Sequence, residues 1–147
     1  MPISVIPASP WAGRSDPEDG AGANRLHHIV EDNARRAVLG FACEAGVIRN
    51  KGRKGAHAGP AAIRRALANM AAPDGAIPFS DLGDVAVTGD DLEPGQAMLS
   101  DKIAEALDKH DRLIVLGGGH ETAVGSYCGL AKHHPDKQIR LFTGRLT

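Results

Sequence analysis

The sequence predicts an α/β fold whose sheet is mostly parallel. Short apolar runs of strand length alternate along the chain with amphipathic segments of helical length, the pattern of helices that connect parallel strands. The clearest strand, residues 113–116, is a run of four aliphatic side chains, as expected where both faces of a strand are covered. Of the 147 residues, 42% are hydrophobic and only 18 are Gly and 9 are Pro, so the composition is that of a folded domain.

The first part of the chain divides into an arm and the start of a domain. Residues 1–25 are broken up by Pro and Gly, so we expect a flexible N-terminal arm. Residues 26–147 are expected to form a partial α/β domain. It opens with a short helix over 26–36, followed by a buried strand over 37–41 and a glycine-rich loop over 42–59.

The rest of the domain alternates more regularly. A helix is predicted to start at Pro60, which suits a first helical turn, and to end before Pro73. The remaining elements are one or two strands within 77–87, a helix over 93–109, the strand 113–116, a helix over 120–132 and the start of a strand over 138–142.

Charge and composition exclude several classes of protein. The 17 basic and 18 acidic residues nearly cancel, so the sequence predicts neither a nucleic-acid partner nor a membrane partner. No signal peptide or apolar run of membrane-spanning length is recognisable, and the two cysteines, Cys43 and Cys128, form no disulfide framework. We therefore expect a cytoplasmic protein.

The most informative site follows the strand 113–116, where three glycines precede His120 and Glu121. Ligands of open α/β sheets bind beyond the carboxyl ends of strands, and glycines let the backbone approach a neighbour closely. The glycine spacing fits neither a phosphate-binding loop nor a dinucleotide-binding loop. His120 could be a metal ligand, a general base or a residue that caps the next helix.

Other polar residues allow both a functional and a structural interpretation. The cations of the loop 42–59 could hold an anionic substrate before the helix that starts at Pro60, or the loop could simply be solvated. Asp81 and Asp84 could act as an acid–base pair, although such residues more often cap turns. The remaining candidates are not expected to form sites: the pairs His27-His28 and His133-His134, which should diverge around a helix, and the cysteines, which lack an activating partner.

The segment from Leu116 to Glu121 resembles the first metal-binding motif of the arginase and agmatinase (ureohydrolase) superfamily. Glu121 after the histidine makes it similar to the formimidoylglutamase branch in particular. Further similar motifs are Trp11-x-Gly13-Arg14-x-Asp16, Gly40-Phe41-Ala42-Cys43, Asn50-x-Gly52-Arg53-x-Gly55-Ala56-x-x-Gly59-Pro60-x-x-Ile63-Arg64, Asp81-x-Gly83-Asp84 and the Leu92-Glu93 helix start. The resemblance extends from about Trp11 to about Ile139.

The resemblance implies a three-layer arginase-like fold and a Mn²⁺-dependent hydrolase of histidine degradation. Its reaction would convert N-formimidoyl-L-glutamate and water to L-glutamate and formamide, with two Mn²⁺ ions and a small amidine as substrate. His120 would be a metal ligand. The glutamyl carboxylates would need cations, for which loop residues are candidates by charge and placement: Arg49, Asn50 and Arg53, with Lys54 a further possibility.

The chain also departs from the resemblance. The family carries its other metal ligands in an Asp-x-His-x-Asp motif and a later Asp-x-Asp motif, but no Asp or His follows Asp136 here. His120 is then the one family ligand present, and this chain alone would bind Mn²⁺ weakly or not at all. We expect an incomplete fold that lacks the C-terminal half, through a frameshift, an early stop or a cut in a longer chain.

Three hypotheses follow. In the first, the chain is a truncated formimidoylglutamase homologue, or a relative acting on another amidine, that is catalytically incomplete and has no identifiable catalytic residue. In the second, it is a non-catalytic interaction fragment that associates with itself or with a full-length homologue through exposed sheet. In the third, it is a small complete enzyme that uses His120 with Asp81 or Asp84 at one metal ion.

Overall fold

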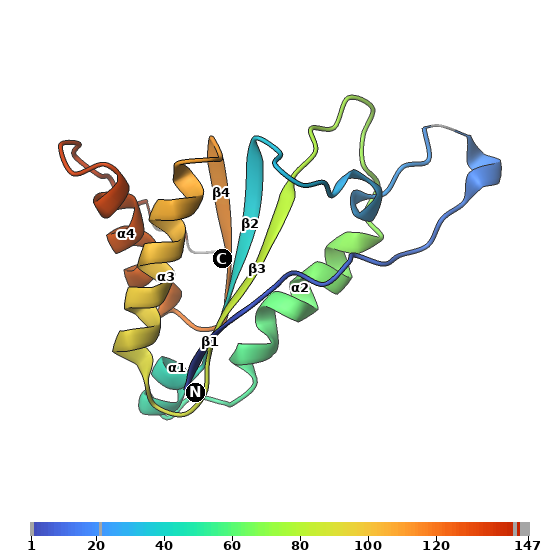
Figure 1. Cartoon of the computed structure of the whole chain (residues 1–147). Helices are drawn as coiled ribbons and strands as arrows, with labels where there is room; N and C mark the ends of the chain where they lie inside the picture. The colour runs from blue at the N-terminus through green and yellow to red at the C-terminus, as the bar shows by residue number, and fades with distance from the viewer. Residues whose placement is uncertain (1, 21, 143, 145–147) are drawn as a thin grey trace.

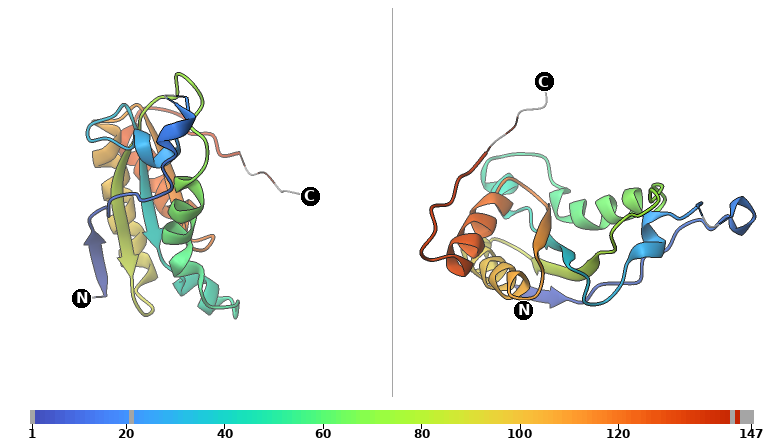
Figure 2. Two further views of the ribbon diagram at one scale, coloured as in Figure 1. Left: turned by 90° about the vertical axis from the view of Figure 1, so that its right-hand side faces the viewer. Right: turned by 90° about the horizontal axis from the view of Figure 1, so that it is seen from above.

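A computed structural model describes residues 2–20, 22–142 and 144 of the chain. It confirms the α/β fold: a four-stranded sheet lies between one helix on one face and two helices on the other (Figure 1 and Figure 2). The strands are β1 (Ile3–Ile6), β2 (Arg36–Ala42), β3 (Ser80–Val87) and β4 (Arg112–Gly117), in the order β1-β3-β2-β4. The three longer strands are parallel, and β1 is antiparallel to β3.

The strand β2 lies in the middle of the sheet because its sequence is apolar on both faces. Its neighbours are β3 on one side and β4 on the other, and five consecutive residues from Ala37 to Phe41 are buried. Phe41 and Leu39 are among the most deeply buried side chains of the chain. They belong to the main hydrophobic core, which also contains Val85 of β3 and two side chains, Leu99 and Ile103, from the helix over residues 92–107.

Two helices cover one face of the sheet and pack closely on each other. They are α3 (Leu92–Leu107) and α4 (Thr122–His133). On α4, Gly125 and Gly129 face α3, and a Cβ atom at either position would lie within 2.7 Å of Leu99 or Ile103. The glycines therefore let the two helices approach closely, which side chains of ordinary size would prevent.

The other face is covered by α2 (Gly59–Ala68), which begins with Pro60 in its first turn as predicted. A five-residue helix, α1 (Ala45–Arg49), lies in the segment predicted as a loop. Five residues are too few to display helical periodicity, so this helix could not be predicted from the sequence pattern. Three 3₁₀ turns complete the structure: η1 (Pro17–Asp19), η2 (Leu26–Ile29) and η3 (Ala56–Ala58).

Three predicted elements differ from the structure. Residues 3–6, expected in a loose arm, form the edge strand β1 beside β3. The helix predicted over 26–36 is only the turn η2, because Val30 bridges to Phe79 and extends the chain toward β2. Residues 138–142 form no strand: no other strand pairs with them, and Phe142 is 88% exposed.

Within the part of the chain that the structure describes, no helix combines the length and the apolar character that a membrane crossing would need.

Candidate functional site

The parallel strands β2, β3 and β4 end at one edge of the sheet, and the segments that follow them meet there. Gly118 donates its backbone N–H to the carbonyl of Phe41 at 2.9 Å, and Gly119 donates to the carbonyl of Cys43. A Cβ atom on Gly118 would lie 2.0 Å from that Cys43 oxygen. The glycines after β4 therefore allow the close backbone approach that the sequence predicted, and they bring the residues before α4 against the end of β2.

His120 lies at this edge, between the glycine turn and the start of α4. Its side chain is exposed, and its carbonyl accepts the backbone N–H of Ala123 at 3.0 Å. The predicted position beyond the carboxyl end of β4 is therefore the observed one. An exposed imidazole can accept a metal ion or a proton without further rearrangement, so the ligand role of His120 stays a prediction.

Glu121 has the opposite environment, although it is the next residue. It is 8% exposed, its carboxylate packs against Gly46 and Gly119, and its Oε1 atom has no hydrogen-bond partner. Cys43 lies beside it: burial, and then the nearby Glu121 carboxylate, hold the pKa of the Cys43 thiol above its usual value. This environment disfavours the thiolate, in agreement with the expectation that Cys43 is not a nucleophile.

A second group of polar side chains surrounds a cavity of about 630 Å³ at the ends of β2 and β3. Glu44 accepts the backbone N–H of Gly55 at 2.6 Å and lies 3.0 Å from Nδ1 of His57. These two partners, the Gly55 N–H first, hold the pKa of Glu44 below its usual value. The sequence analysis did not identify Glu44 and His57 as candidates. Glu44 could have been identified, because it lies two residues after the buried strand β2 and ligands of α/β sheets bind beyond the carboxyl ends of strands.

Arg49 lines the same cavity but is already paired. Its guanidinium forms ion pairs with Asp90 and Glu93, which raise the pKa of Arg49 above its usual value. The other two substrate-binding candidates, Asn50 and Arg53, are exposed in the segment between α1 and η3. The guanidinium of Arg49 is thus engaged by two carboxylates, whereas Asn50 and Arg53 lie exposed at and beyond the end of α1.

Asp81 and Asp84 do not belong to this edge. Both carboxylates bind the guanidinium of Arg64 at 2.6–2.8 Å, and Asp81 also accepts the indole N–H of Trp11 at 2.6 Å. Burial alone would lower the pKa of Arg64, but the hydrogen bonds and charges of the two carboxylates raise it. Arg64 therefore engages both carboxylates, which favours a structural role for Asp81 and Asp84 over the alternative of an acid–base pair.

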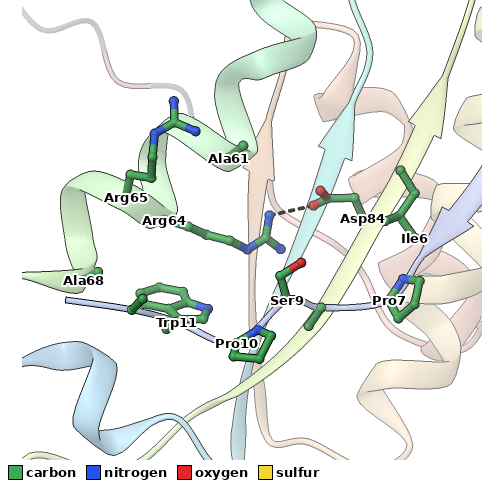
Figure 3. A pocket seen from close by; sticks show the side chains of 12 residues that line it. Ile6, Pro7, Ser9, Pro10, Trp11, Ala61, Arg64, Arg65, Ala68 and Asp84 are labelled. Atoms are coloured by element: carbon green, nitrogen blue, oxygen red, sulfur yellow. Dashed lines mark hydrogen bonds and ion pairs between the residues drawn. The ribbon is translucent and has the colours of Figure 1, made fainter.

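We call these four residues, Trp11, Arg64, Asp81 and Asp84, the Arg64 cluster. Figure 3 shows three of its members, Trp11, Arg64 and Asp84, which line a cavity of about 420 Å³, with Arg64 reaching from α2 toward Asp84 on β3 and Trp11 on the segment that follows β1. The cluster thus ties α2 and the N-terminal segment to the sheet. The third hypothesis requires Asp81 or Asp84 to share a metal ion with His120. Both carboxylates bind Arg64 instead, which disfavours that hypothesis.

The adjacent histidines do not diverge as the sequence suggested. The ring centroids of His27 and His28 lie 3.8 Å apart, and those of His133 and His134 lie 4.4 Å apart. The first pair lies in the turn η2, where His28 accepts the backbone N–H of Arg25. His27 and His28 also contact Arg14 and Ser15, and His133 lies 3.2 Å from the Asp108 carboxylate, but the described residues form no group of three potential metal ligands at either pair.

The described residues do not form the pair of metal sites that the resemblance implies. Among residues 2–20, 22–142 and 144, no three His, Cys, Asp or Glu side chains lie close enough together to hold one ion. His120 is exposed while the neighbouring Glu121 is buried beneath α1, so the two do not converge. These residues do not fit a two-metal centre by themselves.

Comparison with known proteins places this geometry in a family. The sequence model of one protein family, described as the arginase family, matches residues 34–142. This range includes β2, β3, β4 and the glycine turn before His120. The chain belongs to the arginase family. The membership confirms the resemblance that the motifs around His120 and Asn50 indicated.

The chain is similar to curated formimidoylglutamases. It is 43% identical to that of Chromobacterium violaceum over 134 residues, which are 88% of this chain and 43% of the relative. It is 48% identical to that of Vibrio cholerae over 132 residues, which are 84% of this chain and 39% of the relative. The chain thus spans about two fifths of the length of the curated relatives that it matches.

A solved structure agrees. The formiminoglutamase of Trypanosoma cruzi with Mn²⁺ superposes with a TM-score of 0.67 at 26% identity. The superposition covers 77% of this chain and 41% of that chain. The fold is therefore arginase-like over the described sheet and its helices.

Proposed function

We propose that this chain is part of a hydrolase that converts N-formimidoyl-L-glutamate to L-glutamate and formamide in the cytoplasmic degradation of histidine. In this reaction water adds to the amidine carbon, the bond from that carbon to the glutamate nitrogen breaks, and the nitrogen leaves as the amine. The observation that carries the proposal is His120 at the carboxyl edge of a sheet whose sequence is 43–48% identical to formimidoylglutamases.

In this proposal His120 provides one ligand to Mn²⁺, the metal present in the Trypanosoma cruzi formiminoglutamase structure. One imidazole does not hold Mn²⁺ against water, and the described residues bring together no group of three potential metal ligands. We therefore propose that residues 1–147 alone are catalytically incomplete. Relatives more than twice as long support this, because this chain matches only 39–43% of their length.

The ion pairs at the cavity lined by Arg49 support different roles for the substrate-binding candidates Arg49 and Arg53. The guanidinium of Arg49 is balanced by Asp90 and Glu93, so binding a substrate carboxylate there would break existing ion pairs. Arg53 is exposed and lies in the segment that joins α1 to η3, near the edge that carries His120. We propose that Arg53 contributes more than Arg49 to binding the glutamyl carboxylates, with Asn50 as a neighbouring donor.

Turnover tests the reaction. Purified chain is incubated with N-formimidoyl-L-glutamate, with and without Mn²⁺, and released glutamate is measured, while circular dichroism checks that the chain is folded. We expect no release by the folded chain. Mn²⁺-dependent release of glutamate would overturn the proposal that the chain is catalytically incomplete. In parallel incubations with arginine or agmatine, release of urea would identify a different amidine as the substrate.

Binding tests the loop. Amide chemical shifts of the segment 50–58 are followed by NMR as N-formimidoyl-L-glutamate is added, for the native chain and for Arg53→Gln. We expect shifts that require Arg53 and that persist in Lys51→Gln, a cation of the same loop used as the control. Equal loss in both variants would contradict a specific role for Arg53, and binding that survives Arg53→Gln but not Arg49→Gln would reverse the assignment.

A further inference from the structure

The segment 50–58, which carries the proposed substrate cation Arg53, is anchored on both sides of that residue. Before Arg53, the backbone N–H of Gly52 is donated to a carbonyl of α1 at 2.8 Å. After it, the backbone N–H of Gly55 is donated to the carboxylate of Glu44 at 2.6 Å. Arg53 lies between these two hydrogen bonds, and its side chain is exposed. The backbone around the cation is therefore fixed while its guanidinium is free to meet a ligand.

The side chain of Glu44 serves this segment rather than its own helix. Glu44 precedes α1 directly, at the position where an acceptor side chain commonly binds the free N–H groups of the first helical turn. Among the residues that the structure describes, its side chain forms no such bond with α1. The carboxylate oxygen that accepts the Gly55 N–H instead lies 3.0 Å from Nδ1 of His57 as well. The Glu44 side chain is only 18% exposed, so water competes less for these contacts than at an exposed carboxylate.

The backbone of the segment has a shape that needs such contacts. Gly55 has a φ of +122°, and Lys51 has a φ of +56°, which residues other than glycine rarely adopt. A non-glycine residue keeps a positive φ where the surrounding structure holds it there. Lys51 donates its backbone N–H to the carbonyl of Ile48 at 2.9 Å, and Glu44 supplies the corresponding contact at the far side of the segment.

The end of β2 links this segment to the turn that carries His120. The carbonyl of Cys43 accepts the backbone N–H of Gly119, the residue directly before His120. Glu44 is the residue directly after Cys43. Two consecutive residues therefore hold the two parts of the proposed site, one through its backbone and the other through its carboxylate.

We propose that Glu44 is a positioning residue for substrate binding, whose carboxylate holds Gly55 and so keeps Arg53 at a fixed place relative to His120. The inference rests on the proposed function, because that proposal assigns Arg53 to the substrate carboxylates. A segment that is ordered before the substrate arrives loses less conformational freedom on binding, and its affinity for the substrate is correspondingly higher.

Three variants separate positioning from a general loss of charge. Glu44→Ala removes the acceptor of the Gly55 N–H, whereas Glu44→Gln keeps a side-chain carbonyl oxygen that can accept it. The matched control is Glu105→Ala, which removes an exposed carboxylate that is paired with Lys102 on the same helix.

The order of the segment is measured by the heteronuclear ¹⁵N–¹H nuclear Overhauser effect of amides 53–55. We expect these amides to become mobile in Glu44→Ala and to stay ordered in Glu44→Gln and in Glu105→Ala, with the circular dichroism spectrum unchanged. If Glu44→Ala does not fold, Glu44→Asp withdraws the carboxylate by one methylene group, and we expect the same loss of order. A segment as ordered in these variants as in the native chain would overturn the proposal.

Titration with N-formimidoyl-L-glutamate, followed by the same amide signals, tests the effect on binding. We expect the affinity to fall about two- to tenfold in Glu44→Ala and to be restored in Glu44→Gln. Equal affinities of the native chain and Glu44→Ala would overturn the positioning role. No binding by the native chain would contradict the proposed role of Arg53, and the order of amides 53–55 would then decide by itself whether Glu44 holds the segment.

Discussion

The Arg64 cluster and the carboxyl edge around His120 both carry conspicuous polar side chains, but the two regions differ in how completely those side chains are partnered. In the Arg64 cluster, one guanidinium binds two carboxylates and the carbonyl of Gly83, and the side chain of Asp81 is only 2% exposed. At the carboxyl edge, His120 is exposed and Glu121 has a buried oxygen without a partner.

The two regions differ in whether their polar side chains already have partners within the chain. A saturated cluster uses its charges to hold elements together, because removing either partner would leave a buried charge. An edge with an exposed imidazole and an exposed cation keeps groups available for a ligand. Both regions carry motifs that resemble the same family, so the motif alone did not reveal which polar residues are available.

The largest expected effect is on the Arg64 cluster. Arg64→Ala leaves Asp81 and Asp84 without their shared cation, and we expect the free energy of unfolding to fall by about 3 kcal/mol, as for other buried ion pairs that lose one partner. Urea denaturation of the native chain and the variant measures the change. The control is Arg65→Ala, which removes the next guanidinium of α2 from an exposed position and should cost far less. Equal losses in the two variants would contradict the structural role of the cluster.

The next effect concerns the turn that places His120. Gly118→Ala introduces a Cβ atom 2.0 Å from the Cys43 carbonyl oxygen, so the turn or the end of β2 must shift. We expect a loss of about 1–3 kcal/mol of stability, the usual cost of overpacking. Gly22→Ala, where the added Cβ atom would meet only the Asp74 side chain at 3.8 Å, is the control and should change stability little. A Gly118→Ala chain as stable as the native one would show that the close approach is not required.

The smallest effect is a pH dependence at the carboxyl edge. The Gly55 N–H, and then His57, lower the pKa of Glu44 from its ordinary value of 4.5 in the folded chain. The stabilisation is therefore fully present above pH 4.5 and is lost as the pH falls through the lower, folded-state pKa. Urea midpoints measured from pH 7 downward should show Glu44→Gln less stable at pH 7 and the difference shrinking in acid. A difference that stays constant with pH would contradict this pairing.

Much of the fold could be predicted because its signals are local. The aliphatic run of β4, the glycines and His120 are contiguous, so the position of His120 beyond a strand end followed from the sequence. The start of α2 at Pro60 was equally local. In contrast, residues 138–142 contain apolar side chains but no strand, because a strand requires a partner that a sequence pattern does not supply.

Most of what was missed depends on contacts between separate segments. The pairing of Arg64 with Asp81 and Asp84 joins α2 to β3, and the sequence of neither segment predicts this contact. Arg49 was a candidate by charge alone, and only the structure shows Asp90 and Glu93 beside it. The contact between Glu44 and His57 was missed for the same reason, because in the sequence Glu44 precedes α1 and His57 follows the loop after it.

The most direct test of the account is the binding of Mn²⁺ to residues 1–147 at neutral pH, followed by the electron paramagnetic resonance of the free ion. We expect weak binding, because one imidazole has to compete with water. It also predicts that His120→Ala removes whatever binding the native chain has. Two ions bound tightly by the native chain, or binding that His120→Ala leaves unchanged, would contradict the claim that His120 is the single ligand this part of the protein provides.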